Sequence, residues 1–332
     1  MRRFLHRFLI VAVLGYTSLC CIAGVFLADV TLHPGRRPLT AADEFRARGM
    51  SNRHDAQIEN AALSANDGAL LQAWLIRPQR GNGDAVILLH GLSDNRIGMI
   101  GYAELLVKHG FTVLLPDARA HGASGGALAT YGLLESDDLR RWFKWLDSHE
   151  HPGCIFGFGE SMGAAQLLSA LQPEPDFCAV AAESPFSTFR EIAYDRVGQF
   201  FHTGPWLGRT LLFPIVETAF AYARWHDHVD LAGISPLNAA ASSHVPIFLI
   251  HGQQDSNIPV RHSRAIAAQN ASLVLWEVPN ADHCGAVSVA PEEFENKLIA
   301  WFQRHTRVKT ANLSSNPRFP SITASQLGIF HV

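Results

Sequence analysis

Short, almost entirely apolar segments alternate along the chain with longer segments of helical periodicity, and no other feature limits the fold as strongly. A strand that is apolar throughout is typical of a sheet buried on both faces, and strand-then-helix order is typical of parallel strands. The sequence therefore predicts an α/β fold with a mostly parallel central sheet and helices on both faces. The predicted strands are 85–90, 111–116, 154–158, 178–183, 246–251 and 273–278, and predicted helices include 102–109, 135–148 and 162–171.

Two further regions extend or interrupt this pattern. Residues 56–63 and 69–77 are strand-like and are joined by Asn66-Asp67-Gly68, a strong hairpin turn. Between residues 185 and 237 the alternation stops, and the chain is helical and rich in aromatic residues. We expect a helical cap over a sheet edge there; the alternative is additional surface helices. A chain of 332 residues can form one large domain, which we expect over residues 56–306.

The N-terminal segment is apolar enough to cross a membrane. Arg2, Arg3 and Arg7 precede an uncharged run from Phe8 to Ala28, and about 20 apolar residues can span a bilayer as a helix. Signal-peptide cores are usually shorter, roughly 7–15 residues, and no convincing cleavage site follows the run. We expect an uncleaved signal anchor over residues 1–30, with a cleaved signal peptide as the alternative.

The remaining terminal regions are expected to lie outside the packed domain. Residues 31–55 contain proline and arginine and are predicted to be a linker, and the polar, aperiodic residues 307–332 to be a disordered tail.

Arginines lie on both sides of the apolar run, so the charge bias that orients a span is small. We expect a cytoplasmic N-terminus and a domain outside the cytoplasm; the alternative is a secreted or periplasmic protein.

The sequence Gly159-Glu160-Ser161-Met162-Gly163 lies between a predicted strand and a predicted helix. Glycines two residues before and after a serine permit the sharp strand-to-helix turn that exposes a nucleophile. The turn also lies at the carboxyl edge of the parallel sheet, where ligands bind, and at the positive end of a helix. Ser161 is therefore the candidate nucleophile. The other interpretation is an ordinary serine in a glycine-rich turn.

A serine nucleophile needs a base, and the base needs an orienting acid. Asp255 and His283 follow two later strands, so both are expected at the same sheet edge as Ser161. Asp282 is a second candidate for the acid, but it adjoins His283 and would reach its ring with difficulty. Glu160 is interpreted as a structural neighbour of the serine rather than an acid–base group.

These residues belong to a series of motifs through which the chain resembles the α/β-hydrolase superfamily, in particular its serine esterases, its lipases and its prolyl-oligopeptidase-related members. The resemblance covers residues 56–305, and the motifs occur in the expected order. They are LLHGLSDNR, PDARAHGASGG, GESMG, SPLNAA, HGQQDSNIP and ADH. The resemblance implies an acid at Asp255 and a histidine at His283. It also implies an oxyanion hole built from the backbone N–H groups of Leu92 and Met162.

The strand order of the same superfamily would place Cys154 and Cys178 on neighbouring strands. A disulfide between them is possible if the domain lies outside the cytoplasm, and buried free thiols are the alternative. The domain has three cysteines, and an odd count argues against a complete disulfide framework.

Other functional classes are disfavoured by charge and spacing. The formal net charge of −3 provides no basic surface for nucleic acid. The clusters His149-Glu150-His151 and His226-Asp227-His228 lack the spacing of metal ligands, so we expect no metal and no cofactor. The preferred function is a carboxylesterase-like serine hydrolase that acts on an ester or lipid-like acyl substrate through a Ser-His-Asp triad. The alternatives are a serine peptidase, an acyltransferase or thioesterase, and a catalytically silent binding protein.

Overall fold

The chain folds around one eight-stranded sheet. The computed structural model describes residues 1–172 and 176–307. The strand order is β1-β2-β4-β3-β5-β6-β7-β8; β1 and β2 are antiparallel, as are β2 and β4, and all other pairs are parallel. The predicted α/β class and all eight predicted strands are confirmed. The strands are β1 Ala56–Ser64, β2 Leu70–Pro78, β3 Ala85–Leu89, β4 Thr112–Pro116, β5 Ile155–Glu160, β6 Ala179–Glu183, β7 Ile247–Gly252 and β8 Val274–Val278.

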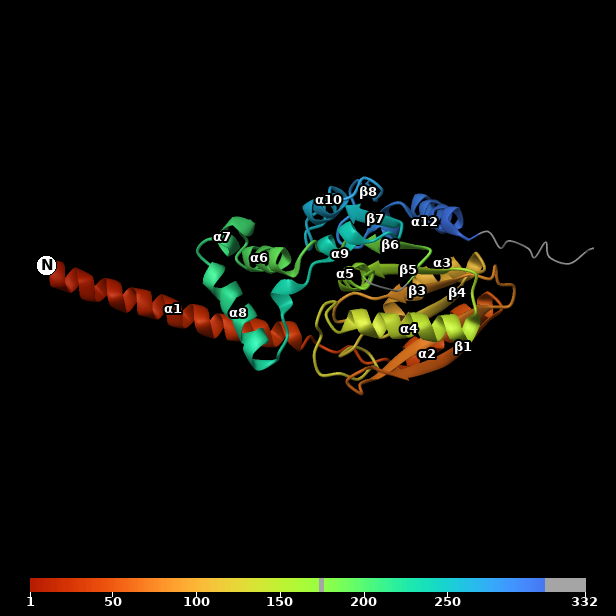
Figure 1. Ribbon diagram of the computed structural model, residues 1–332, viewed down its shortest axis with the longest axis horizontal. Coiled ribbons are helices and arrows are strands. Elements are labelled where there is room, and N and C mark those ends of the chain that lie inside the picture. The colour runs from red at the N-terminus through yellow and green to blue at the C-terminus, as the bar shows by residue number, and fades with distance from the viewer. Residues whose placement is uncertain (173–175, 308–332) are drawn as a thin grey trace, which may run out of the picture.

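Helices cover both faces of the sheet (Figure 1). In β3, Val86 and Leu88 face one buried cluster while Ala85, Ile87 and Leu89 face the other, as the two-residue period of a strand requires. Helices α2, α3 and α12 contribute to the first cluster, and α4, α5, α9 and α10 to the second. The helices are α1 Arg2–Leu32, α2 Ala41–Arg53, α3 Ile100–Lys108, α4 Glu135–Glu150, α5 Met162–Ser169, α6 Phe189–Phe200, α7 Pro205–Arg209, α8 Phe213–His226, α9 Pro236–Ser242, α10 Arg261–Ala267, α11 Ala286–Val289 and α12 Pro291–His305.

Helix α2 lies within residues 31–55, where the sequence predicts a linker. The Thr40 side chain accepts a hydrogen bond from the Asp43 backbone N–H, and the Asp43 carboxylate accepts one from the Thr40 backbone N–H. This capping box begins the helix. Ala47 and Met50 are then buried in the first cluster. Residues 41–53 are therefore a packed part of the domain. The predicted tail, apart from Arg307, lies outside the described residues.

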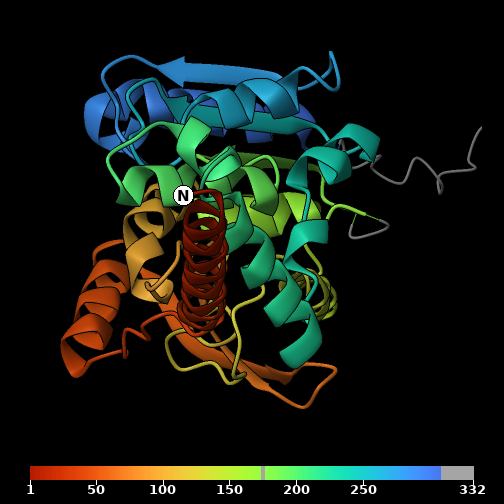
Figure 2. The ribbon, with the colours of Figure 1, turned by 90° about the vertical axis from the view of Figure 1, so that its left-hand side faces the viewer.

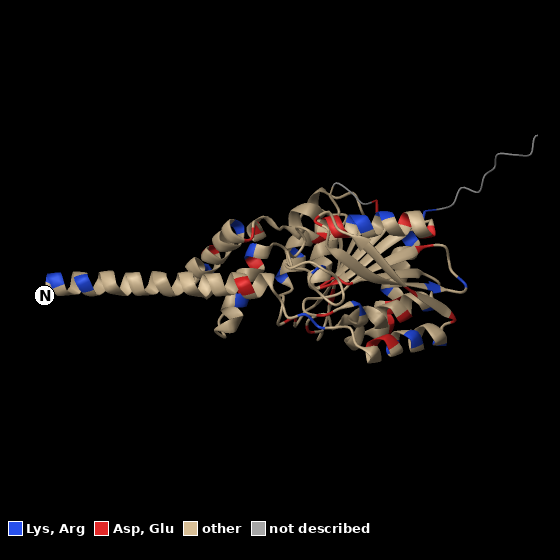
Figure 3. Cartoon of the chain, turned by 90° about the horizontal axis from the view of Figure 1, so that it is seen from below, with Lys and Arg blue, Asp and Glu red and all other residues tan. Residues whose placement is uncertain are grey.

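Residues 185–237 form a cap of α6, α7, α8 and a short 3₁₀ helix, η2 (Leu231–Gly233). The cap residues belong to a third buried cluster, distinct from the two that flank the sheet, which also includes residues of α1 and α5. Helix α1 packs along α8 and then projects away from the domain on the cap side (Figures 1 and 2). Among the described helices, α1 alone is long and apolar enough to cross a membrane, a test that a signal sequence also passes. Its middle carries no charged side chains (Figure 3).

Cys154 and Cys178 form a disulfide, with their Cα atoms 5.7 Å apart. Each cysteine immediately precedes one of two neighbouring parallel strands, β5 and β6, and the Cys178 N–H donates to the Ile155 carbonyl at 2.9 Å. The disulfide joins β5 and β6 at the amino edge of the sheet, opposite the edge at which Ser161 lies. Disulfides of this kind persist in oxidising compartments.

Candidate active site

Ser161 occupies a sharp turn between β5 and α5. Its φ of 53° and ψ of −115° lie outside the regions that serine normally adopts. The turn requires both flanking glycines. A Cβ at position 159 would lie 2.6 Å from the Gly163 carbonyl carbon, and one at position 163 would lie 2.4 Å from the Leu89 carbonyl oxygen. The Ser161 N–H donates to the Glu183 carbonyl of the next strand at 2.8 Å, which holds the turn on the sheet.

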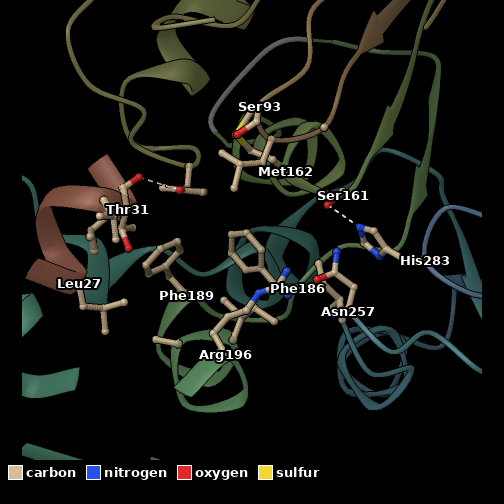
Figure 4. Close-up of a pocket in the computed structure, with 18 of the residues that line it drawn as sticks. Leu27, Thr31, Ser93, Ser161, Met162, Phe186, Phe189, Arg196, Asn257 and His283 are labelled. Carbon is tan, nitrogen blue, oxygen red and sulfur yellow. Dashed lines mark hydrogen bonds between the residues drawn. The ribbon is translucent and has the colours of Figure 1, made fainter. Parts of the chain in front are cut away.

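The structure brings Ser161, His283 and Asp255 together in one hydrogen-bonded chain. The Ser161 hydroxyl donates to His283 Nε2 at 2.9 Å, and His283 Nδ1–H donates to Asp255 Oδ2 at 2.9 Å. Figure 4 shows the His283 ring turned toward Ser161. This arrangement allows the imidazole to accept the hydroxyl proton while the carboxylate holds the ring in the required tautomer.

Asp255 is held as a buried carboxylate. Its Oδ1 accepts hydrogen bonds from the N–H groups of Asn257 at 2.9 Å and Ile258 at 2.7 Å. Burial raises the pKa of this carboxyl, but hydrogen bonds from His251 and His283 outweigh burial and leave its pKa well below the usual range. Asp255 is thus ionised at neutral pH and able to stabilise an imidazolium.

Asp282, the other candidate for the acid, points to a different partner. Its Oδ1 accepts hydrogen bonds from the Ser256 N–H at 2.8 Å and from the Ser256 hydroxyl at 3.0 Å. These bonds tie the loop that carries Asp255 to the loop that carries His283. Asp282 therefore supports the two loops, while Asp255 contacts the histidine.

Leu92 and Met162 both line the same cavity as Ser161. Met162 is the first residue of α5, so its N–H has no acceptor within the helix. Leu92 lies in the loop after β3, which the buried His90 holds in place. His90 Nε2 accepts from the Ala118 N–H at 3.0 Å, so its Nδ1–H donates to the Gly91 carbonyl at 2.7 Å. Burial lowers the His90 pKa, in keeping with a neutral ring.

A cavity of about 570 Å³ opens beside Ser161, within the usual range for ligand sites. Its walls are mainly apolar and come from the cap, from the end of α1 and from the loops around Ser161. Phe186 and Phe189 lie between Ser161 and the far wall, and Arg196 and Asn257 add polar groups (Figure 4). Trp206 and Phe213, which the sequence could not place, do not line the cavity and are exposed on the cap.

Glu183 is a buried site residue that the motifs did not indicate. It ends β6 directly beneath Ser161, and its carboxyl accepts from the Ala286 N–H at 3.0 Å and the Tyr102 hydroxyl at 3.3 Å. Burial raises the Glu183 pKa to about 8. Burial, reinforced by Asp94, also raises the pKa of neighbouring Glu160 to about 7. The only available sequence signal for Glu183 was a glutamate at the carboxyl end of an otherwise apolar strand.

The two histidine clusters take up other contacts. His149 stacks on Trp145, and His226 Nδ1 hydrogen-bonds to Asp227 at 2.9 Å. Within residues 1–172 and 176–307, no group of three or more His, Cys, Asp and Glu residues could hold a metal ion. Cys284, beside His283, has its pKa raised well above the usual value by burial, so its thiol is a poor competitor for Ser161 as nucleophile.

Comparison with known proteins agrees with the fold. The sequence profile described as the alpha/beta hydrolase family matches residues 86–297. The uncharacterized protein YqkD of Bacillus subtilis is 28% identical over 206 residues, which cover 60% of this chain and 65% of YqkD, just under two thirds of its length. The uncharacterized peptidase YuxL of Bacillus subtilis is 22% identical over 84% of this chain and 43% of YuxL. The esterase Pf2001 of Pyrococcus furiosus superposes with a TM-score of 0.65 at 26% identity, covering 83% of this chain and 99% of the esterase.

Proposed function

Since the chain belongs to the alpha/beta hydrolase family, we propose that it is a serine hydrolase that cleaves carboxylic esters. The observation that carries the proposal is the hydrogen-bonded chain Ser161–His283–Asp255 facing a largely apolar cavity. The likeness to the Pyrococcus esterase favours an ester as the substrate. An apolar cavity of this size suits the acyl part of such an ester.

The reaction proceeds by acyl transfer in two steps. Ser161 Oγ attacks the ester carbonyl while His283 accepts the hydroxyl proton, and the C–O bond to the alcohol breaks as His283 returns that proton to it. A water molecule, deprotonated by His283, then attacks the acyl-enzyme and releases the acid. Asp255 orients His283 and stabilises its protonated form. The N–H groups of Leu92 and Met162 bind the oxyanion, and a single such donor is typically worth about 10²–10³ in rate.

A peptidase is the second candidate. It is favoured by the match to YuxL, whose name describes a peptidase, although less than half of YuxL is covered. The same catalytic residues would serve either reaction, as they would an acyltransferase or a thioesterase. Parallel assays with ester and peptide substrates separate these activities.

We also propose that the domain lies outside the cytoplasm and that α1 is retained as a membrane anchor. Three arginines precede the apolar part of α1, and a cytoplasmic location for them follows the positive-inside tendency. The Cys154–Cys178 disulfide suits an oxidising compartment.

Fluorophosphonate labelling tests the proposed function. We expect the wild-type protein to be labelled and Ser161→Ala to remain unlabelled, because only a hydrogen-bonded serine next to a base is nucleophilic enough. Asp255→Ala and His283→Ala should both lose nearly all ester hydrolysis while remaining folded. A folded wild-type protein that is not labelled would instead favour a binding protein on the same fold.

A further inference from the structure

Helix α1 is part of the wall of the cavity that contains Ser161. Leu27, Ala28, Val30 and Thr31 all line that cavity. Figure 4 shows Leu27 and Thr31 at the end remote from Ser161, with Phe189 between. The last two turns of the apolar helix therefore close the end of the cavity where the tail of a bound substrate would lie.

The contact between α1 and the cap is close and continuous. Cys20, Gly24, Ala28 and Leu32, spaced four residues apart, form the buried face of α1. At Gly24 the helices approach so closely that a Cβ would lie 2.5 Å from the Thr218 Cβ of α8. Small residues at this spacing are typical of helices that pack tightly within membranes.

Two hydrogen bonds join the end of α1 to the hydrolase domain itself. The Leu32 carbonyl accepts from the Ala129 N–H at 2.9 Å, and the Thr31 carbonyl accepts from the Tyr131 hydroxyl at 2.8 Å. Tyr131 also lines the cavity. The position of α1 is therefore coupled to the walls of the site and not only to the cap.

The part of α1 that the cap leaves free is too short to cross a bilayer by itself. The Tyr16 hydroxyl contacts the Leu211 carbonyl just before α8, so the cap covers α1 from about Tyr16 onward. The free stretch between Arg7 and Tyr16 is about 12 Å long at 1.5 Å per residue, whereas a bilayer core is about 30 Å thick. A membrane crossed by α1 must therefore extend over the part of α1 that α8 covers.

The exposed surface of the cap is suited to contact with a membrane. Its exposed large apolar side chains are Phe200, Phe201, Trp206, Leu211, Phe213 and Trp225. They belong to the part of the molecule from which α1 projects (Figure 1). Tryptophan is enriched at the membrane–water interface, and exposed Phe and Leu side chains can bury at the boundary between the head groups and the acyl chains. Four charged cap residues form two ion pairs, Arg190 with Glu217 and Arg209 with Glu191, which lowers the cost of placing these four near lipid.

We propose that α1 and the cap form one membrane-seated unit, and that the cavity takes the acyl chain of a glycerolipid ester from the adjoining leaflet. The inference rests on the proposed function, since Ser161 performs the cleavage. Ser161 Oγ bonds to the acyl carbon, the ester C–O bond breaks, and His283 protonates the glycerol oxygen. Water then releases the free fatty acid and regenerates Ser161.

The test uses the full-length protein in phosphatidylcholine vesicles that contain dioleoylglycerol. Gly24→Leu separates α1 from α8, whereas the control Gly15→Leu adds the same side chain where no atom lies within 4 Å of the added Cβ. We expect Gly24→Leu to lower dioleoylglycerol hydrolysis at least about tenfold more than p-nitrophenyl acetate hydrolysis, and Gly15→Leu to change neither. Equal losses on both substrates, or none, would overturn the proposal. Fluorophosphonate labelling is read in parallel: an unlabelled wild type would overturn the proposed function itself.

A second measurement stays informative even if Gly24→Leu does not fold. Brominated lipids quench tryptophans that lie in the bilayer, so Trp206→Phe should reduce the quenched fraction of the fluorescence. Trp145→Phe, on α4 of the hydrolase domain, should not reduce it. If Trp206→Phe leaves the quenched fraction unchanged, the cap is not seated in the membrane and the proposal is wrong.

Discussion

Replacing Glu183 by glutamine should make the protein less sensitive to pH. The Glu183 carboxyl is fully buried and accepts hydrogen bonds from the Ala286 N–H and the Tyr102 hydroxyl. Burial raises its pKa from 4.5 to about 8, so the folded protein keeps this group protonated at neutral pH. Glutamine is the neutral isostere of the protonated acid. Its amide oxygen can accept from the Ala286 N–H, and its NH2 group can donate to the Tyr102 hydroxyl oxygen, as the O–H of a protonated carboxyl would.

The sign and size of the effect follow from proton linkage. In the unfolded chain Glu183 ionises near pH 4.5, and in the folded chain near pH 8, so the folded state binds more protons between these values. The free energy of unfolding therefore falls as pH rises through this window. At about 1.4 kcal/mol per pKa unit, the wild type should lose about 4 kcal/mol relative to Glu183→Gln between pH 5 and pH 8. Glu160 adds a decline of the same sign, but it is present in both proteins.

Thermal unfolding in detergent, followed by circular dichroism at pH 5, 6, 7 and 8, measures this difference. A domain of this size shifts by about 2–4 °C per kcal/mol, so the gap between the two Tm values should change by about 10 °C across the range. Glu292→Gln, at an exposed position on α12, is the matched control and should follow the wild type. Parallel pH profiles for wild type and Glu183→Gln would refute the assignment of a buried, protonated carboxyl.

Two further predictions concern the disulfide at the amino edge of the sheet and the glycine before the Ser161 turn. The free energy of unfolding of the double variant Cys154→Ser, Cys178→Ser should be lower than that of the wild type by about 3 kcal/mol, the value expected for a cross-link spanning 24 residues. A reducing agent should lower the Tm of the wild type but not that of the variant. A wild-type Tm that does not respond to the reducing agent would contradict the disulfide. Gly159→Ala should destabilise the protein by about 1–3 kcal/mol, because its Cβ would meet backbone atoms of the Ser161 turn. Gly101→Ala, at an open position in α3, should change stability by less than about 1 kcal/mol; equal Tm values for the two alanine variants would contradict this account.

The strands and the relative position of the site residues could be predicted from the sequence because both depend on local pattern. Apolar runs identified six of the eight strands, the hairpin turn at residues 66–68 indicated the other two, and the carboxyl ends of parallel strands share one edge. That topology was sufficient to expect Ser161, Asp255 and His283 near one another. Helix α2 was missed because its apolar face is narrow, although Thr40 and Asp43 carry the signature of a capping box.

The contact between α1 and the cap could not be predicted from local sequence pattern. A helix that is apolar on all sides has no face that indicates a packing partner, so residues 1–30 were expected only as an anchor. The small residues Gly24 and Ala28, four positions apart, were the one available signal of a close helix contact. Their partner, α8, lies nearly 200 residues further along the chain.

Side-chain periodicity over a few neighbouring residues determines which segments are strands and which are helices. Local backbone sterics determine the strained turn at Ser161. The order of the strands along the chain then places the acid and the histidine after two later strands, at the same sheet edge as Ser161. Each of these properties can be inferred without knowing which distant segments meet. Three others arise only on packing: Asp255 rather than Asp282 contacts His283, Glu183 is buried beneath the nucleophile, and α1 closes the cavity. All three depend on contacts between distant segments, and burial, which sets the Glu183 pKa, exists only once those segments have packed together.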